Sequence, residues 1–275
     1  MDLLADPQAL AARICEVGYA KAELNDNLLA RVFDIYGLAD DFFHAGLEAK
    51  QACRSAAHVE GYLPIGSEYS IDQDRRDLHE GFLVWSRNRG LRHTSLEQSR
   101  LRSAMHSLFA AYTQGSADII AALRARIAPD APPLELSDHS YMQVNFYEPP
   151  KHDRDTLQDR HEDGHLLNFV KATSPGLEIE VDGRFEPVRL ARNEVLVMPG
   201  SVLTALTGGL IPPLYHQVRN LGAPASRLSL MFFINPPVRP IAPWIVNDTN
   251  RDTNILDLLL KNSAMFGLPA LDELA

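Results

Sequence analysis

The sequence predicts a mainly β domain with flanking helices, in which the strands form a sandwich or a jelly-roll barrel. Two observations predict this class. From about residue 137 onward, short apolar runs follow one another with turn signals between them, a pattern typical of antiparallel β domains. Before that point, apolar residues recur at the spacing of amphipathic helices. We therefore expect helices that cover the strands.

The bulk composition limits the class of protein. The chain has 275 residues, of which 45% are hydrophobic and 23% are charged, and this fits one globular domain. A formal net charge of −10 argues against a nucleic-acid binder, which needs a basic surface. No apolar run approaches the roughly 20 residues that span a bilayer, and the acidic start is unlike a secretory signal. We expect a cytoplasmic protein without membrane or nucleic-acid partners, and the oligomeric state stays open.

Helical patterns dominate the first half of the chain. Asp6 followed by Pro7 is typical of a helix start, and a second pattern runs over residues 27–43. A long third helix is expected to begin near Ser95. Between the second and third helices, residues 59–77 are rich in Gly, Pro and Ser, so we interpret them as a loop that borders a pocket.

Seven apolar runs of the second half are interpreted as strands. They are, in order, "YMQVNFY", "HLLNFV", "LEIEV", "EVLVM", "SVLTAL", "LYHQV" and "RLSLMFFI". Asp182 and Gly183 suit a tight hairpin turn between two strands, and a helix over residues 255–266 is expected to close the chain. The expected single domain, residues 1–275, comprises a mainly helical region (1–136), a jelly-roll core (137–240) and a C-terminal helical part (241–275).

The stretch "RHEDGHLLNF" contains candidate metal ligands. His161 and Asp163 are two positions apart, and on a strand such residues point to the same face. His165 continues the alternation. His216, several predicted strands later, is the best candidate for a third ligand. Two imidazoles and one carboxylate form a triad that leaves positions open on Fe(II).

Two further pairs suggest a site for a carboxylate. Arg227 and Ser229 alternate in "SRLSLMFF", and a guanidinium beside a hydroxyl is well suited to hold a carboxylate. The apolar residues around them are typical of a buried strand and argue against a surface position. Asn145 and Tyr147 also alternate in "VNFYEPP". Their amide and phenol are expected to complete a polar pocket.

In combination, these motifs resemble the isopenicillin N synthase-like branch of the Fe(II)/2-oxoglutarate-dependent oxygenases. The resemblance extends from about Ser140 to Pro237, and it continues more faintly upstream in "GYLPIGSEYS" and "DLHEGF". The motifs on which the resemblance rests are His161-x-Asp163, His216, Arg227-x-Ser229, "NFYEPP", "GLEIEVDGRFEPV" and "FFINPP".

The resemblance implies a double-stranded β-helix that binds Fe(II) and 2-oxoglutarate and uses O2 as co-substrate. It implies iron ligands at His161, Asp163 and His216. It implies 2-oxoglutarate contacts from Arg227, Ser229, Tyr147 and Asn145. The expected activity is the oxidation of a small metabolite of secondary metabolism by hydroxylation, desaturation or cyclisation, with release of succinate and CO2.

Substrate recognition is less clearly specified. His165 stands where the family usually has a small residue, so we interpret it as part of the pocket wall and not as a fourth ligand. Further candidates for the substrate pocket are Tyr62, Ser67, Tyr69 and Phe82. Gly208 and Gly209, upstream of His216, permit backbone angles that strain other residues, and their role stays open.

Three other hypotheses are compatible with the sequence. An Fe(II) oxidase of the same fold that works without 2-oxoglutarate is the nearest, because similar Arg and Ser residues would then hold a substrate carboxylate. The second is a barrel that binds a ligand without catalysis. The open metal site argues against it, because a protein that only binds a ligand does not need one. A hydrolytic zinc enzyme is the third, but no convincing general base stands beside the candidate ligands.

Overall fold

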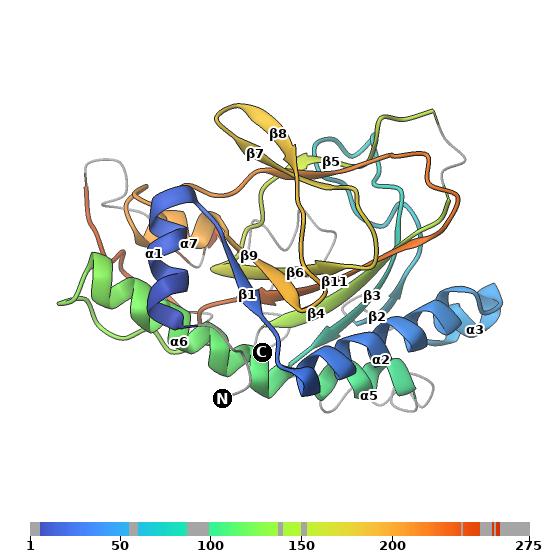
Figure 1. Ribbon diagram of the computed structural model, residues 1–275, viewed down its shortest axis with the longest axis horizontal. Helices are drawn as coiled ribbons and strands as arrows, with labels where there is room; N and C mark the ends of the chain where they lie inside the picture. The colour runs from blue at the N-terminus through green and yellow to red at the C-terminus, as the bar shows by residue number, and fades with distance from the viewer. Residues whose placement is uncertain are drawn as a thin grey trace.

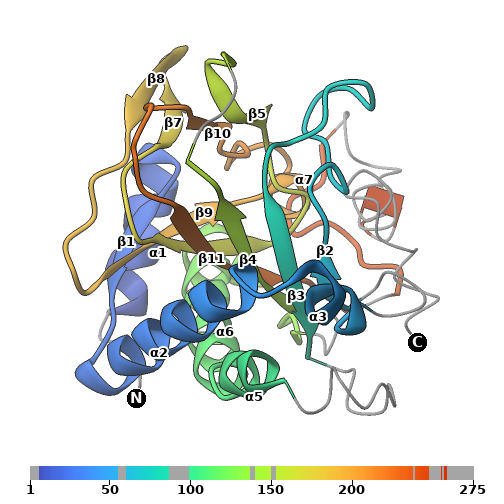
Figure 2. The same ribbon diagram turned by 90° about the vertical axis from the view of Figure 1, so that its right-hand side faces the viewer.

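The computed structural model describes residues 6–54, 60–86, 99–136, 140–149, 153–237, 239–247, 255 and 257–258. Two antiparallel sheets face each other, and helices cover the outer side of the larger sheet (Figures 1 and 2). The predicted class, a mainly β fold with flanking helices, is therefore confirmed.

The elements follow one another with short connections. The helices are α1 (Pro7–Val17), α2 (Asp26–Phe43), α3 (Leu47–Ala52), α5 (Arg100–His106), α6 (Phe109–Ile127) and α7 (Ser201–Leu206). The first strands are β1 (Ala20–Glu23), β2 (Gly61–Leu63), β3 (Glu80–Trp85), β4 (Tyr141–Tyr147), β5 (Thr156–His161) and β6 (Leu167–Ala172). The remaining strands are β7 (Leu177–Val181), β8 (Arg184–Pro187), β9 (Glu194–Pro199), β10 (His216–Arg219) and β11 (Arg227–Ile234).

The larger sheet has the order β1-β9-β6-β11-β4-β3-β2, and the smaller sheet has the order β5-β10-β7-β8. Strands that are distant in the chain are thus neighbours in space, as in a jelly roll. The mainly helical first half of the chain contributes β1, β2 and β3 to the larger sheet. All eight residues of β11 are buried, because this strand lies inside the sheet between β6 and β4 and is covered on both faces.

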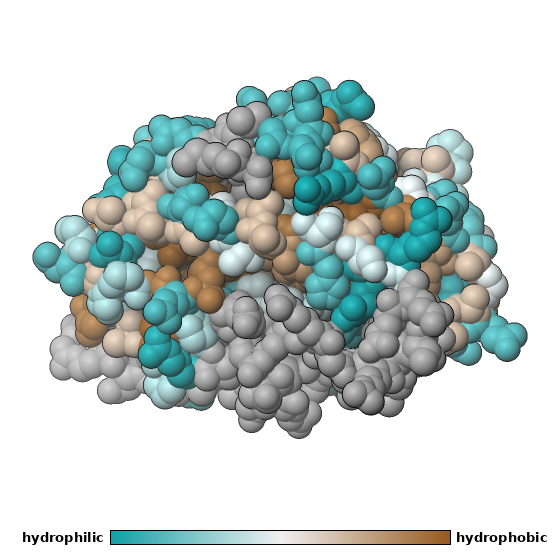
Figure 3. Space-filling view, turned by 90° about the horizontal axis from the view of Figure 1, so that it is seen from below, coloured by the Kyte–Doolittle hydropathy of each residue, from teal (hydrophilic) through white to brown (hydrophobic). Residues whose placement is uncertain are grey.

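The first two helices begin where the local sequence supplies a cap. The Asp6 carboxylate accepts a hydrogen bond from the backbone N–H of Gln8 at 3.0 Å, and Pro7 occupies the first helical position. The Asn25 side chain caps α2 in the same way. Both helices bury an apolar stripe and expose polar residues. The face seen from below the helices of Figure 1 accordingly carries many hydrophilic side chains, with smaller hydrophobic patches between them (Figure 3).

The predicted hairpin is present. Asp182 and Gly183 connect β7 to β8 with φ angles of 50° and 75°, the left-handed backbone that a primed two-residue turn requires.

Two expected elements differ in the structure. "SVLTAL" forms helix α7 and not a strand, because Val202, Leu203 and Leu206 are buried together only at helical spacing. The long third helix is divided into α5 and α6 near Ser107, whose hydroxyl donates to the carbonyl of Ala104 at 2.7 Å. A serine that bonds to the preceding turn competes with continued helix.

Three further details refine the expectations. The loop over residues 59–77 contains the short strand β2. The helix predicted over residues 255–266 lies largely outside the described residues. In the parts of the chain that the structure describes, no helix has the length and apolarity needed to cross a bilayer.

Candidate metal centre and active site

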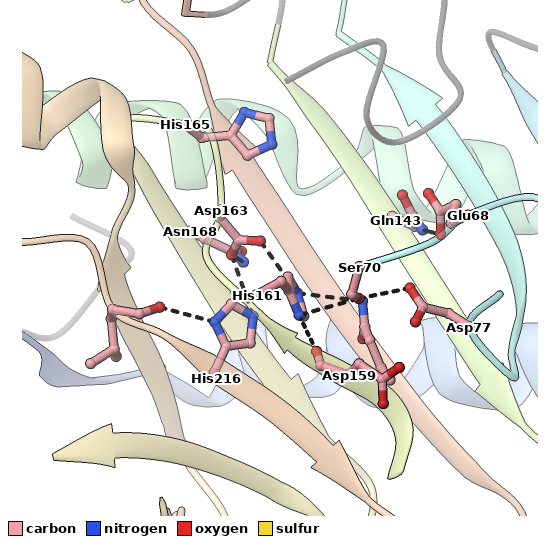
Figure 4. Close-up of polar contacts among 12 residues, drawn as sticks. Glu68, Ser70, Asp77, Gln143, Asp159, His161, Asp163, His165, Asn168 and His216 are labelled. Atoms are coloured by element: carbon pink, nitrogen blue, oxygen red, sulfur yellow. Dashed lines mark hydrogen bonds and ion pairs between the residues drawn. The ribbon is translucent and has the colours of Figure 1, made fainter. Parts of the chain in front are cut away.

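Two neighbouring strands of the smaller sheet bring the candidate ligands together. His161 ends β5 and His216 begins β10, and the two residues are paired in the sheet register. Asp163 lies in the connection between β5 and β6, so the strand predicted through all three residues of "HEDGH" ends at His161. The Asp163 carboxylate nevertheless lies 3.8 Å from His161 Nε2 and 3.7 Å from His216 Nε2 (Figure 4).

Backbone carbonyls fix the orientation of both imidazoles. His161 Nδ1 lies 2.7 Å from the carbonyl oxygen of Asp159, and His216 Nδ1 lies 3.1 Å from that of Leu214. A carbonyl only accepts, so each Nδ1 carries the proton and donates it. Each Nε2 lone pair is left to face Asp163. This is the arrangement in which histidine binds a metal through Nε2.

The connection that carries Asp163 is held from two sides. Asn168 on β6 donates a side-chain hydrogen bond to the Asp163 carboxylate. The backbone N–H of Ser201, at the start of α7, donates to the Asp163 carbonyl at 2.9 Å. Gly200 is so close to this connection that a Cβ atom there would lie within 3.0 Å of the backbone of Asp163 and His165. The sequence therefore needs a glycine at position 200 for packing and not for a special φ angle.

The protonation states suit a divalent cation. Burial, and then the neighbouring His216, lower the pKa of His161 to about 4. Burial alone would raise the pKa of Asp163, but His216, His161 and His165 outweigh it and lower the pKa. At neutral pH His161 is therefore a neutral imidazole and Asp163 a carboxylate, the forms in which these groups bind metals.

The donor set fits a metal ion. The ligand atoms of His161, Asp163 and His216 all lie within 4.8 Å of one another, and all three residues are buried. Two imidazole nitrogens and a carboxylate oxygen on one side of a cavity suit Fe(II) with open coordination positions.

The four residues predicted to hold a carboxylate also lie together. In the register of β11 with β4, Arg227 is opposite Tyr147 and Ser229 is opposite Asn145. Ser229, Asn145 and Tyr147 line the same cavity as the three candidate metal ligands. The Arg227 guanidinium lies 5.2 Å from the centroid of the Tyr147 ring, so the cation is placed against an aromatic face.

Arg227 has unused hydrogen-bond donors. Its Nε donates to the carbonyl of Ser174 at 3.2 Å, but Nη1 and Nη2 are buried and have no partner among the described residues. Burial lowers the pKa of Arg227, yet a guanidinium stays charged in proteins. A buried fork of donors without an acceptor is costly, so the site fits an anionic ligand such as a carboxylate.

The sequence comparisons agree with this geometry. Residues 139–236 match the family described as the 2OG-Fe(II) oxygenase superfamily. The match covers a little over one third of the chain and includes strands β4 to β11. The matched region contains all seven residues discussed above, and Fe(II) and 2-oxoglutarate are the cofactors typical of the family.

Individual relatives of this chain are distant. It is 26% identical over 226 residues to the oxoglutarate-dependent flavonoid 7-O-demethylase 1 of Ocimum basilicum, with coverage of 76% of this chain and 59% of the demethylase. The chain thus spans about three-fifths of the length of that relative.

Solved structures share the fold. A full-length protein of Neurospora crassa, solved in complex with alpha-KG, has a TM-score of 0.77 at 16% identity, with 94% of this chain and 90% of that chain covered. A putative 2OG-Fe(II) oxygenase family protein of Caulobacter crescentus has a TM-score of 0.74 at 21% identity, with 94% and 93% covered. At such identities these similarities show the double-stranded β-helix fold.

The predicted substrate residues are in different places. The His165 ring lies 3.1 Å from the Tyr141 hydroxyl and 2.8 Å from Asn235 Oδ1, apart from the three candidate ligands (Figure 4). Tyr62 and Phe82 are buried, and both rings pack edge-on against Phe42.

Ser67 and Tyr69 lie in the loop that precedes β3. The Ser67 hydroxyl donates to the carbonyl of Pro64 at 2.6 Å, and Tyr69 forms an isolated β-bridge with Arg76. None of the five predicted substrate residues (Tyr62, Ser67, Tyr69, Phe82 and His165) is among the residues that line the cavity.

Several polar residues of the cavity were not predicted. They are Glu68, Tyr141, Gln143, Gln158 and Asn168. Tyr141 and Gln143 belong to the same alternation as Asn145 and Tyr147 along β4, so the period of two could have identified them. Glu68 lies in an irregular loop, where no periodicity marks it.

Proposed function

We propose that the protein is a non-haem Fe(II)/2-oxoglutarate-dependent dioxygenase that oxidises a small molecule by hydroxylation, desaturation or cyclisation. One observation carries the proposal. A buried guanidinium whose two terminal nitrogens have no partner among the described residues is paired in the sheet register with Tyr147, and Tyr147 lines the cavity that contains the His-Asp-His cluster. An iron ligand set with a carboxylate site beside it is what 2-oxoglutarate requires, because it has to contact both.

The residues have separate roles in this proposal. His161, Asp163 and His216 hold the iron and leave positions open. Arg227 and Ser229 hold the distal carboxylate of 2-oxoglutarate, and Tyr147 and Asn145 assist. The shared fold with the Neurospora crassa protein, which was solved with alpha-KG, supports this assignment.

When bound, Fe(II) and 2-oxoglutarate supply the oxidising chemistry: in a hydroxylation, substrate, 2-oxoglutarate and O2 give hydroxylated substrate, succinate and CO2. The protein orients the two organic molecules and excludes water. Every ligand and carboxylate-site residue is at most 6% exposed, so a reactive species formed there is protected from solvent.

A direct assay is the release of labelled CO2 from 2-oxoglutarate labelled at carbon 1. The protein is incubated aerobically with Fe(II) and ascorbate, first alone and then with pools of candidate substrates. We expect slow release without substrate and faster release with a matching pool. In His216→Ala the release of CO2, with and without substrate, should fall to the rate that free Fe(II) gives without protein, because the variant loses a metal ligand.

The main alternative is an Fe(II) oxidase that does not use 2-oxoglutarate. In that enzyme Arg227 would hold a carboxylate of the substrate itself. Oxygen consumption that requires Fe(II) and a substrate pool, but not 2-oxoglutarate, would support this alternative and overturn the proposal. A function that survives in His216→Ala would instead indicate a binding protein without catalysis.

A further inference from the structure

Glu68 brings a carboxylate into the wall of the cavity. The residue is 5% exposed and lines the cavity together with Gln143 on β4. Its Oε2 accepts hydrogen bonds from His79 Nε2 at 2.6 Å and from Gln143 Nε2 at 2.9 Å. No donor among the described residues reaches its second oxygen, Oε1. Glu68 and Gln143 lie side by side, apart from the three candidate metal ligands (Figure 4).

The carboxylate determines the orientation of two amides. Glu68 can only accept, so Gln143 presents its NH2 group to it. The same nitrogen also donates to Asn145 Oδ1 at 2.8 Å, which uses both N–H bonds of Gln143. Gln143 therefore lines the cavity with its Oε1 left out of both hydrogen bonds. Asn145, whose oxygen is occupied, directs its NH2 group toward the Tyr147 hydroxyl.

The cavity consequently has two ends of opposite character. On the side of Tyr147 the donors are the Asn145 amide and, behind the cavity wall, the guanidinium nitrogens of Arg227, which does not itself line the cavity. Around Glu68 the free groups are two acceptors, Glu68 Oε1 and Gln143 Oε1, which we call the acceptor wall. The donor end suits 2-oxoglutarate, and a second carboxylate would be repelled at the acceptor wall.

The histidine that contacts Glu68 has a raised pKa. Burial alone would lower the pKa of His79, but its hydrogen bond to Glu68 and the charges of Glu68 and Asp77 outweigh burial and raise the pKa. A His79 imidazolium that donates to Oε2 stabilises the carboxylate and leaves Oε1 as a strong acceptor. On β11, Met231 faces Gln143 and Phe233 faces Tyr141, and both side chains line the cavity. The space beside the acceptor wall is thus bordered by apolar groups.

We propose that the substrate is a nitrogen-containing small molecule that has an apolar body and binds the acceptor wall, Glu68 and Gln143, through N–H donors. The proposal rests on the proposed oxygenase function, since it treats the contents of the cavity beyond 2-oxoglutarate as the substrate. Glu68 would then act as a residue that determines specificity, because it selects donors and rejects carboxylates.

The test uses three probes that share a ring and differ in one group: benzamidine, benzamide and benzoate. Their binding is measured by ligand-observed NMR with Zn(II) and saturating 2-oxoglutarate present, so that Arg227 is occupied and no turnover takes place. We expect benzamidine and benzamide to bind at least about ten-fold more tightly than benzoate. Glu68→Gln should weaken benzamidine binding by about ten-fold or more.

Two further variants make the test specific. Gln143→Met removes the second acceptor at similar volume and should also weaken the binding of benzamidine. This variant keeps the proposal testable if a change at Glu68 impairs folding. Glu178→Gln is the matched control: Glu178 is a buried carboxylate on β7 that accepts from Gln217 at 2.8 Å and does not line this cavity. It should leave benzamidine binding unchanged.

The proposal is overturned if benzoate binds as well as benzamidine, if benzamidine does not bind up to its solubility limit, or if Glu68→Gln leaves its affinity unchanged. Binding of 2-oxoglutarate is recorded in the same samples. If 2-oxoglutarate does not bind but benzamidine binds through Glu68, the proposed oxygenase function is contradicted, whereas the role proposed for the acceptor wall is supported.

Discussion

Arg227 has two buried nitrogens that lack an acceptor among the described residues. In the absence of ligand this is a liability for stability, because a buried cation without a partner is costly. The cost is offset if, as proposed, the carboxylate of 2-oxoglutarate completes the site. Under the proposed function, ligand binding and stability make opposite demands on this residue.

Replacement of Arg227 by methionine tests this conflict. We expect Arg227→Met to melt at the same temperature as the wild type or higher without 2-oxoglutarate, and to bind 2-oxoglutarate more weakly by about 2–5 kcal/mol. Thermal unfolding and calorimetric titration measure the two effects. Arg219→Met is a suitable control, since that side chain is 55% exposed. A variant that keeps normal 2-oxoglutarate affinity would remove Arg227 from the site.

His79 provides a prediction about pH. Its pKa is raised in the folded protein, so its bond to Glu68 contributes stability that is fully present below the ordinary histidine pKa of about 6.5. That contribution is lost as the pH rises through the raised value. Urea unfolding at a series of pH values should show a free-energy advantage of the wild type over His79→Gln that shrinks from acidic to alkaline pH. A constant difference would show that His79 is not ionised in the folded state.

At the residue scale, the sequence was sufficient where spacing along a strand determines the site. Arg227, Ser229, Asn145 and Tyr147 alternate along β11 and β4, and they meet because those strands are neighbours in register. Glu68 could not be predicted in this way. It reaches the cavity through an irregular loop whose path depends on tertiary contacts, such as the hydrogen bond from His79.

Helix α7 and the β5–β6 connection form one structural unit at the element scale. Gly200 lies against the backbone of Asp163 and His165, and the next residue, Ser201, donates to the Asp163 carbonyl. The sequence run "SVLTAL" is as apolar as the neighbouring strands, so composition alone did not distinguish the helix. What distinguishes it is the burial of Val202, Leu203 and Leu206 on one helical face.

A pair of glycine substitutions tests this unit. Gly200→Ala should destabilise the protein by about 1–3 kcal/mol through overpacking, and it should also weaken metal binding because Asp163 is displaced. Gly37→Ala is the matched control: it lies on the exposed face of α2 with no atom within 4 Å of the added Cβ. It should stabilise the protein by about 0.5–1 kcal/mol. Equal metal affinity in the two variants would contradict the role assigned to Gly200.

On the scale of the whole molecule, the metal is expected to connect parts that fold from distant segments. His161 and His216 belong to the smaller sheet, and Asp163 is held by Asn168 of the larger sheet. A ligand that binds only the folded state stabilises it by about 2.7 kcal/mol at a concentration of 100 times its Kd. The melting temperature should therefore rise with the concentration of Zn(II) or anaerobic Fe(II), and this rise should be absent in His216→Ala. A rise that persists in His216→Ala would place the metal elsewhere.

The overall architecture was predictable because the alternating runs define the strands and the capped amphipathic stretches define α1 and α2. The partition of strands between the two sheets was not, since strand order depends on pairings between distant segments. β1 illustrates this point: it follows the first helix, yet it pairs with β9 at the edge of the larger sheet.

The central claim is that one cavity binds Fe(II) and 2-oxoglutarate together, and an anaerobic titration tests it most directly. The metal-free protein is titrated with Fe(II) and then with 2-oxoglutarate while the visible spectrum is recorded. We predict a metal-to-ligand charge-transfer band that saturates at an equimolar ratio, is absent in His216→Ala and needs far more 2-oxoglutarate in Arg227→Met. Iron binding without any band on addition of 2-oxoglutarate would contradict the claim and favour the oxidase that works without this co-substrate.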